Sequence, residues 1–328
     1  MLHLPIVVIF SSLVLALAHN PRKTNYDEQT ARMLLNMSAA AYGNLQQTCI
    51  NGIHSSPYTV LSPLKGRCDG WLDTCAGYIA ASDVDKHLII VFRGSMTWLQ
   101  IASQGAEYLS PVEFYGMGNV SDLNKNEDIT SEVNHYFADG VEVLWPSIQQ
   151  VLRNPMYSNY TVTFTGHSLG GALAAVATAR TVAEGLRPGH QLTVYTFGEP
   201  RVGNVDFAKT FDRLIPNSYR VVFGKDIVPH LPFCKKKWEI FGPCVLSSPN
   251  WHHGTEIWYP KSMSVGSSYV ECVGEPRGED ATCSNRHNLW FYFLHISQLF
   301  LHNHFVYDHR HYFDIEVPEF GKEGCPIG

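Results

Sequence analysis

The sequence lacks several motifs that would define its class at once. It contains no C-x-x-C pair, no G-x-G-x-x-G motif and no Walker A motif, so common zinc, dinucleotide and P-loop sites have no support. Its 24 Lys and Arg against 30 Asp and Glu give a net charge of −6, without the basic character typical of nucleic-acid-binding proteins. It also lacks internal repeats and low-complexity stretches. We therefore expect no cofactor, no metal and no nucleic-acid partner.

Long hydrophobic runs are also scarce. Residues 4–18 form the main one, about 15 residues that end in the small-x-small pattern Ala16-Leu17-Ala18. This length fits a signal-peptide core and is short for a membrane span, although no Lys or Arg precedes it. We expect residues 1–18 to be a cleaved signal peptide and residues 19–328 to be a single secreted domain without a transmembrane segment. An uncleaved N-terminal anchor is the alternative.

Eight cysteines and three sequons support the expectation of secretion. Eight cysteines allow 105 pairings, and the sequence alone does not choose among them. Three short separations suggest local loops and leave the two outermost cysteines for each other. The expected pairs are Cys49–Cys325, Cys68–Cys75, Cys234–Cys244 and Cys272–Cys283. The N-x-S/T sequons at Asn36, Asn119 and Asn159 are candidate glycosylation sites.

Runs of β-branched residues alternate with helical patterns along the chain. Expected helices cover 27–42, 139–153 and 169–185, and expected strands cover 78–81, 87–92, 161–165, 192–197 and 219–223. Residues 49–75 are rich in turn formers and are expected to be loops. Residues 95–134 have little periodicity, as in lids or disordered connections. The alternation predicts an α/β fold with a mainly parallel central sheet and helices on both faces, stapled by disulfides.

The strongest single motif is a G-x-S-x-G sequence made of Gly166, Ser168 and Gly170. A β-rich segment precedes it and a helix of small residues follows it, which is the context of a nucleophile elbow. The two glycines remove side chains that would strike the neighbouring strand or helix. The turn also places Ser168 at a helix N-terminus, which favours a developing anion. An idle serine in a glycine-rich turn is the alternative.

A nucleophilic serine requires a base, and the base requires an acid that orients it. Asp226 follows the expected strand 219–223 directly, as the acid should, although it could instead be a turn aspartate that caps local backbone. Asp212 lies in a surface-like helical segment, and Asp308 adjoins the C-terminal histidines. Spacing alone does not choose the base among His287, His295, His302, His304, His309 and His311. These histidines also permit a metal interpretation, which no acidic or cysteine ligand pattern supports.

Five blocks together resemble the class 3, or fungal-type, lipase family of α/β-hydrolases. They are Val91-Phe-Arg-Gly-Ser95, Gly166-His-Ser-Leu-Gly-Gly171, Gly198-Glu-Pro-Arg-Val-Gly203, Asp226-Ile-Val-Pro-His-Leu-Pro232 and Asp308-His309-x-x-Tyr312-Phe313. They occur in the family's order and span most of the chain after residue 18. The last block selects His309 as the base, and the outermost cysteine pair also resembles the family's.

The resemblance implies further site residues. It assigns the oxyanion hole to Ser95 and Leu169 through backbone N–H groups. It places a lid just beyond, where the sequence has Met96, Trp98, Leu99 and Ile101. Fully covering one such side chain is worth about 1.5–3 kcal/mol, so we expect the lid to close in water and open on lipid. An ordinary packed loop is the alternative. Residues 102–134 depart from the family pattern, as does the long aromatic segment 289–305.

The resulting hypothesis is a secreted serine hydrolase that cleaves lipid carboxylic esters of the triacylglycerol type. Ser168 attacks the ester, His309 transfers the proton, and Asp226 orients the imidazole through an acyl-enzyme cycle. The expected partners are a lipid or other ester substrate and, transiently, a lipid interface. Alternatives are a phospholipase A1, a feruloyl-type esterase for soluble esters, and a catalytically dead lipid-binding protein.

Overall fold

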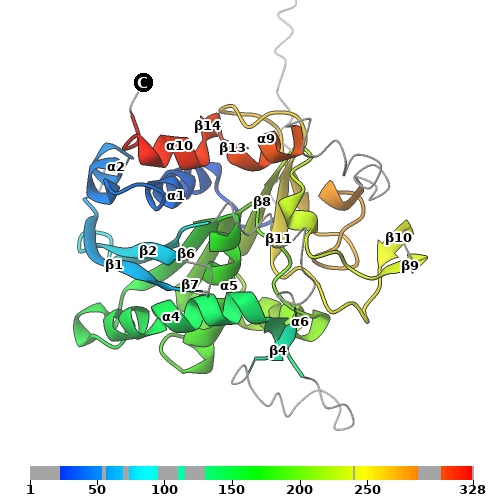
Figure 1. Cartoon of the computed structure of the whole chain (residues 1–328), viewed down its shortest axis with the longest axis horizontal. Coiled ribbons are helices and arrows are strands. Elements are labelled where there is room, and N and C mark those ends of the chain that lie inside the picture. The colour runs from blue at the N-terminus through cyan, green and yellow to red at the C-terminus, as the bar shows by residue number, and fades with distance from the viewer. Residues whose placement is uncertain are drawn as a thin grey trace, which may run out of the picture.

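A computed structural model describes residues 23–53, 57–68, 74–94, 110–114, 130–238, 241–286 and 304–326. Figure 1 shows the arrangement of its elements. The helices are α1 (Glu28–Ala40), α2 (Gln46–Ile53), α4 (His135–Leu152), α5 (Leu169–Ala183), α6 (Val205–Leu214), α9 (His304–Arg310) and α10 (Val317–Lys322). The strands are β1 (Thr59–Arg67), β2 (Thr74–Ser82), β3 (His87–Phe92), β4 (Pro111–Glu113), β5 (Glu132–Asn134), β6 (Thr161–His167), β7 (Leu192–Phe197), β8 (Ser218–Phe223), β9 (Lys236–Trp238), β10 (Phe241–Cys244), β11 (Thr255–Tyr259), β12 (Val270–Cys272), β13 (His311–Tyr312) and β14 (Ile315–Glu316).

An eight-stranded sheet forms the centre of the molecule, in the order β1-β2-β3-β6-β7-β8-β11-β12. The five strands from β3 to β11 run parallel, which confirms the expected parallel arrangement for the middle of the sheet. The outer strands β1, β2 and β12 pair antiparallel. Strands β3, β6, β7 and β8 are almost fully buried, as strands covered on both faces must be.

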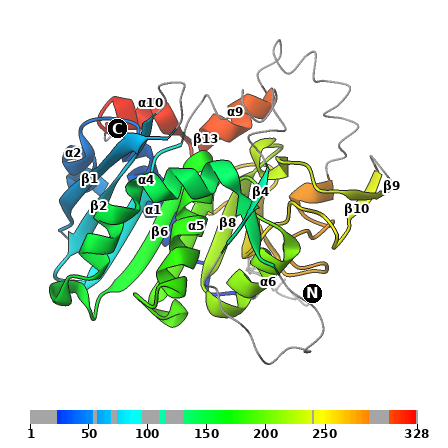
Figure 2. The ribbon, with the colours of Figure 1, turned by 60° about the horizontal axis from the view of Figure 1, so that its bottom comes forward.

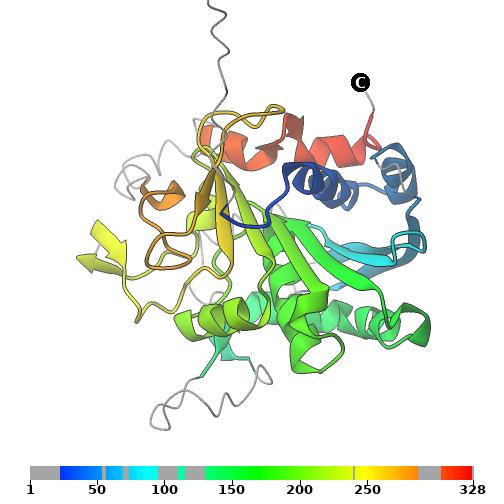
Figure 3. The same cartoon turned by 180° about the vertical axis from the view of Figure 1, so that it is seen from behind.

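Helices cover both faces of this sheet, as the alternating pattern predicts. Helix α5 packs on β3, β6 and β7, and α4 lies beside it against β1 and β2. Helix α1 packs on the opposite face against β3, β6 and β7. Each face has its own apolar core. The C-terminal helix α10 lies beside α1 although the two are far apart in sequence, as Figure 3 shows from behind. Helices from the two ends of the described chain therefore pack together on the face of the sheet that α1 covers.

One expectation for the fold is wrong. Residues 49–75 contain part of α2 and all of β1 rather than loops alone. The pattern missed β1 because it is an edge strand in which Leu64 is the only fully buried residue. An edge strand of this kind gives no hydrophobic alternation that a sequence pattern can detect. The predicted strands at 87–92 and 192–197 match β3 and β7 at both ends.

Four disulfides connect the chain, and their pairing is the one expected from the sequence. The Cys49–Cys325 bridge joins α2 to the segment after α10, and the other three close loops of 7 to 11 residues. Of the three sequons, Asn159 is exposed just before β6, Asn36 is partly covered within α1, and Asn119 lies outside the described residues. The predicted signal peptide, residues 1–18, also lies outside them. Within the described chain, we find no helix with the length and apolar character of a membrane span.

Candidate active site

Ser168 occupies the sharp turn between β6 and α5. Its backbone has φ 60° and ψ −132°, a conformation that non-glycine residues rarely adopt and that concentrates at functional sites. Its N–H donates to the Phe197 carbonyl at 2.8 Å, which fixes the turn to β7. A Cβ atom at Gly166 would lie 2.2 Å from the Gly170 carbonyl oxygen, so the motif glycine is required by close packing.

Three polar side chains from distant parts of the sequence meet at this turn. The Nε2 atom of His309, at the end of α9, lies 2.8 Å from the Ser168 hydroxyl oxygen. The Nδ1 atom of the same ring lies 3.0 and 2.9 Å from the two carboxylate oxygens of Asp226, which follows β8. All three residues are buried. The arrangement has the geometry of a nucleophile, a base and an orienting acid.

Two further groups hold the Asp226 carboxylate in place. The N–H of Val228 donates to Oδ1 at 2.9 Å, and the hydroxyl of Tyr312 donates to Oδ2 at 2.6 Å. Burial and the charge of Asp226 raise the pKa of Tyr312 well above its usual range, so this hydroxyl stays a donor. Asp226 therefore caps local backbone and contacts His309 at the same time, and the two interpretations of this residue are compatible.

A second histidine, His167, supports the backbone of His309. The carbonyl of His309 can only accept, so His167 donates to it from Nε2, at 2.7 Å. The Nδ1 atom of His167 is then an acceptor for the Tyr42 hydroxyl at 2.8 Å. Burial, with the neighbouring His309 ring, lowers the pKa of His167 to about 3 and keeps this ring neutral. A neutral ring is required for one donor and one acceptor nitrogen.

Gly94, two residues after the end of β3, packs directly against the turn that holds Ser168. A Cβ atom at this position would lie 2.2 Å from the Tyr42 hydroxyl oxygen and 3.0 Å from the Ser168 Cβ. The next residue, Ser95, and the predicted lid residues Met96, Trp98, Leu99 and Ile101 lie outside the described residues. Leu169 is buried as the first residue of α5, where a backbone N–H has no acceptor within the helix.

The other candidate acids and the one other candidate histidine with a described side chain lie away from Ser168. Asp308 accepts the Lys225 N–H at 2.8 Å, and Asp212 pairs with Arg277 at 2.8 Å. His311 is partly exposed and donates from Nδ1 to the Tyr307 carbonyl at 2.8 Å. The side chains of His287, His295, His302 and His304 lie outside the description. None of the described candidates competes with Asp226 or His309 for Ser168.

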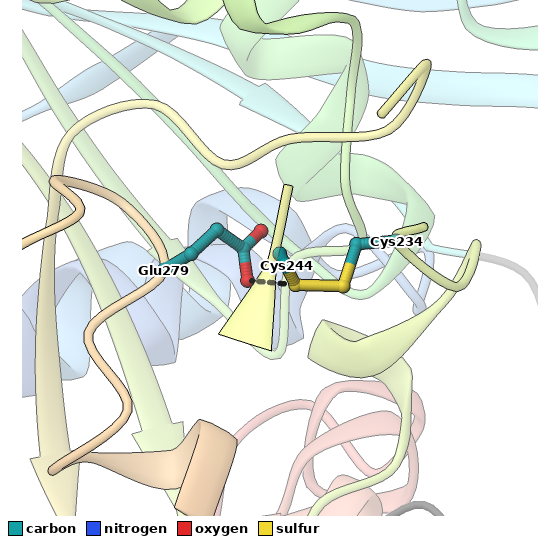
Figure 4. A group of neighbouring side chains, drawn as sticks. All are labelled: Cys234, Cys244 and Glu279. Atoms are coloured by element: carbon teal, nitrogen blue, oxygen red, sulfur yellow. Dashed lines mark hydrogen bonds between the residues drawn. A yellow bond between two sulfur atoms is a disulfide. The ribbon is translucent and has the colours of Figure 1, made fainter. Parts of the chain in front are cut away.

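Two groups of potential metal ligands occur within the described part of the chain, and both contain a disulfide. They are Cys234, Cys244 and Glu279, drawn in Figure 4, and Glu256, Cys272 and Cys283. Sulfur atoms bonded to each other are not thiolates and cannot bind a metal as such. The carboxylate of Glu279 is already bonded to Arg201. We therefore assign both groups to structure.

Sequence reasoning missed three residues of the site. Tyr42 carries no signal, because nothing in the sequence links it to a motif that begins more than 120 residues later. Tyr312 and His167 both lie inside blocks that resemble the lipase family. Their contacts with Asp226 and Tyr42 form only when the fold brings these distant segments together. A polar residue next to a catalytic motif is the only signal that could have marked them.

Comparisons with known proteins place the chain in a family. The family model described as Lipase (class 3) matches residues 89–236. A Caenorhabditis elegans protein named as a lipase is 42% identical over 318 residues, which cover 93% of this chain and 84% of that protein. The chain belongs to the class 3 lipase family and so to the carboxylic ester hydrolases, as the five blocks imply.

More distant relatives agree on the fold. The secreted mono- and diacylglycerol lipase 1 of Fusarium solani is 28% identical over 220 residues, which cover 64% of this chain and 60% of that protein. The structure of lipase II from Rhizopus niveus matches with a TM-score of 0.64 and 23% identity, over 91% of this chain and 97% of that one. The expected α/β-hydrolase fold is confirmed.

Proposed function

We propose that this protein is a secreted lipase that cleaves acylglycerol esters with Ser168 as nucleophile, His309 as base and Asp226 as acid. The observation that carries the proposal is the continuous hydrogen-bond series from the Ser168 hydroxyl through the His309 ring to the Asp226 carboxylate. Two names among the relatives, a mono- and diacylglycerol lipase and a triacylglycerol lipase of Arabidopsis thaliana, support the substrate class.

The chemistry follows from the positions of these groups. His309 takes the Ser168 proton while the hydroxyl oxygen attacks the ester carbonyl, and the backbone N–H groups of Leu169 and Ser95 stabilise the oxyanion. His309 then protonates the departing alcohol, and water cleaves the acyl-enzyme by the reverse proton path. Asp226 holds the imidazole in the tautomer that leaves Nε2 free to accept.

Secretion is part of the proposal. Four disulfides support passage through an oxidising compartment, because such bonds are rare where thiols are kept reduced. The proposed leader, residues 1–18, is cleaved, the remainder folds as one domain, and one or more of the three sequons carry a glycan. Expression in insect cells with N-terminal sequencing and glycosidase treatment of the secreted product tests all three points.

Ser168→Ala tests the assignment of the nucleophile. The variant should fold normally, lose nearly all hydrolysis of p-nitrophenyl esters and no longer react with a fluorophosphonate probe. The matched acid variants are Asp226→Asn and Asp308→Asn. Asp308 bonds the Lys225 backbone rather than His309, so its variant should lose far less turnover. Full activity in Ser168→Ala, or equal losses in the two aspartate variants, would contradict the proposal.

A substrate panel separates a lipase from its nearest enzymatic alternatives. We expect long-chain triacylglycerol emulsions to be cleaved, with higher activity above the solubility limit of the ester. Preference for the sn-1 ester of a phospholipid would indicate a phospholipase A1. Preference for short soluble or feruloyl esters without activation by an interface would indicate an esterase.

A further inference from the structure

The hairpin formed by β9 and β10 carries a sequence pattern that the active site does not use. Cys234-Lys-Lys-Lys-Trp238 places three consecutive lysines beside a tryptophan, and the Cys234–Cys244 disulfide closes the hairpin at its base. The hairpin starts where the match to the family model ends, at residue 236. Figure 2 shows β9 and β10 at the periphery of the molecule, away from the sheet.

Large apolar side chains are exposed on and beside this hairpin. Trp238 is 62% exposed, Leu246 is 57% exposed and Phe233 is 39% exposed. The Trp238 ring lies across Gly242, where a Cβ atom would stand 2.6 Å from the indole. The ring is thus held on the hairpin with its outer face in water. All three belong to the short segment that includes the hairpin, and exposed large apolar side chains are candidates for an interaction site.

Positive charge accompanies these apolar groups, although the chain as a whole carries −6. Lys235 and Lys237 are exposed, and no ion pair is seen for either within the described residues. The Lys237 ammonium lies 5.4 Å from the centre of the Trp238 ring. Lys236 is half-buried, and burial with the nearby Arg201 charge lowers its pKa. Counting Glu239, residues 235–239 still carry a net charge of +2 (three Lys, one Glu).

The base of the hairpin is fixed to the protein rather than free to swing. The Cys244 sulfur lies 3.3 Å from the buried Glu279 carboxylate, as Figure 4 shows, and Glu279 pairs with Arg201. The Lys235 N–H donates to the Ser248 hydroxyl at 3.0 Å. Its carbonyl accepts the Val245 N–H at 2.9 Å. Because the base of the hairpin is already fixed, binding through its exposed side chains does not carry the entropy cost of ordering a loop.

We propose that this hairpin is a docking site for an anionic lipid surface, separate from the proposed catalytic residues. Trp and Phe side chains enter the boundary between headgroups and acyl chains, while lysines face negatively charged headgroups. The segment from Asp226 to Cys234 joins the docking site directly to the loop of the catalytic acid. The inference rests on the proposed lipase function, because docking would bring the enzyme to its substrate. The binding test itself does not require hydrolysis.

Vesicle binding tests the charge. Binding of a Ser168→Ala background to sedimented vesicles of phosphatidylcholine alone, or with 30% phosphatidylglycerol, avoids hydrolysis during the measurement. Each lysine near an anionic surface contributes about fivefold to binding, so Lys235→Gln with Lys237→Gln should weaken binding to the anionic vesicles by about 25-fold. The control pair Lys65→Gln with Lys261→Gln removes the same charge from exposed positions elsewhere and should change it less than twofold.

The apolar contribution has its own variant. Trp238→Ser should weaken binding to the anionic vesicles at least tenfold, whereas Val265→Ser, at a position that is 86% exposed, should leave it unchanged. Equal binding to both vesicle types, or equal losses in hairpin and control pairs, would overturn the proposal. Hydrolysis of soluble p-nitrophenyl butyrate by the same variants with Ser168 intact should equal wild type. If wild type cleaves no ester, the proposed function fails while the binding result still stands.

Discussion

The ring of His167 lies stacked on the ring of His309, with the two ring centroids 4.7 Å apart. His167 also donates to the backbone carbonyl of His309, so this one side chain contacts both the ring and the main chain of the proposed base. His167 is the last residue of β6 and immediately precedes the proposed nucleophile Ser168. It thereby positions His309, which lies 142 residues further along the chain. The His167 ring is buried, and its Nδ1 atom must stay unprotonated to accept the Tyr42 hydroxyl.

Stability should therefore fall as the pH is lowered below about 6.5. His167 stays neutral in the folded protein down to pH about 3, whereas an unfolded histidine takes up its proton near pH 6.5. Between these values the unfolded state binds more protons, so the free energy of unfolding decreases with falling pH. By pH 5 this one residue accounts for a loss of about 2 kcal/mol. Urea unfolding at pH 7.5 and pH 5 measures it.

A variant isolates the contribution of this histidine. His167→Gln should be less stable at pH 7.5 but should show a shallower loss between pH 7.5 and pH 5. Burial also lowers the pKa of His252, so part of the slope remains in the variant. An unchanged slope in His167→Gln would show that His167 is not the group responsible.

Tyr312→Phe removes one of the two donors that hold the Asp226 carboxylate in addition to His309. The lost bond is short, at 2.6 Å, and its acceptor is charged, so we expect a destabilisation of about 1.5–3 kcal/mol. We also expect kcat to fall about tenfold with little change in KM, because Asp226 loses support without any change in substrate contacts. Steady-state hydrolysis of a short soluble ester measures both.

Tyr78→Phe is the matched control for this variant. Tyr78 is another buried tyrosine, and its hydroxyl donates to the Met37 carbonyl at 2.7 Å rather than to any of the proposed catalytic groups. It should lose stability while its kcat stays at the wild-type value. Equal losses of kcat in the two variants would mean that Tyr312 acts only through the general stability of the fold.

Gly198→Ala should disrupt the bond between the proposed acid and base. Its Cβ atom would lie 2.7 Å from Oδ2 of Asp226 and 2.9 Å from Nδ1 of His309. Displacement of about 1 Å at a catalytic pair costs roughly 100-fold in rate. Gly185→Ala is the control, since that glycine also has a positive φ of 65° but has nothing within 4 Å of a Cβ atom. A similar loss of kcat in both variants would indicate backbone strain alone.

The sequence predicts this fold well where hydrophobic pattern and burial coincide. The sequence predicts β3 and β7 at both ends because each is rich in apolar and β-branched residues and lies in the middle of the sheet. The hydrophobic pattern does not predict β1, because this strand is exposed along the edge of the sheet and includes Pro63. Pattern analysis detects burial rather than strand geometry, so an edge strand is invisible to it.

The candidate site divides in the same way. A local motif predicts Ser168 and a position directly after a strand predicts Asp226, whereas only the family resemblance separates His309 from five other histidines. Tyr42 and His167 support the proposed base through contacts between the turn after α1, the end of β6 and α9, which no local pattern connects. Long-range hydrogen bonds are properties of the packed fold, and this explains why they became visible only in the structure.

The buried Arg201–Glu279 pair should contribute to the stability of the fold and hold the base of the β9–β10 hairpin in place. Arg201 donates to both carboxylate oxygens of Glu279, at 2.6 and 2.8 Å, and to the carbonyl of His230 at 2.7 Å, just after the proposed acid. Burial alone would raise the pKa of Glu279, but the charge and hydrogen bonds of Arg201 outweigh it and lower this pKa. Glu279→Gln leaves a buried cation without its partner and should cost about 3–5 kcal/mol in urea unfolding.

Replacing both partners separates the pair's charge from its packing. Arg201→Met with Glu279→Leu removes both charges, so it should recover at least half of the stability lost in Glu279→Gln. The control Glu184→Gln breaks the partly exposed pair with Arg180 and should cost no more than about 1 kcal/mol. Because the guanidinium of Arg201 also bonds the chain after Asp226, the double variant should still lose kcat on soluble esters. A double variant with wild-type kcat and wild-type vesicle binding would show that this buried pair positions neither the acid loop nor the hairpin.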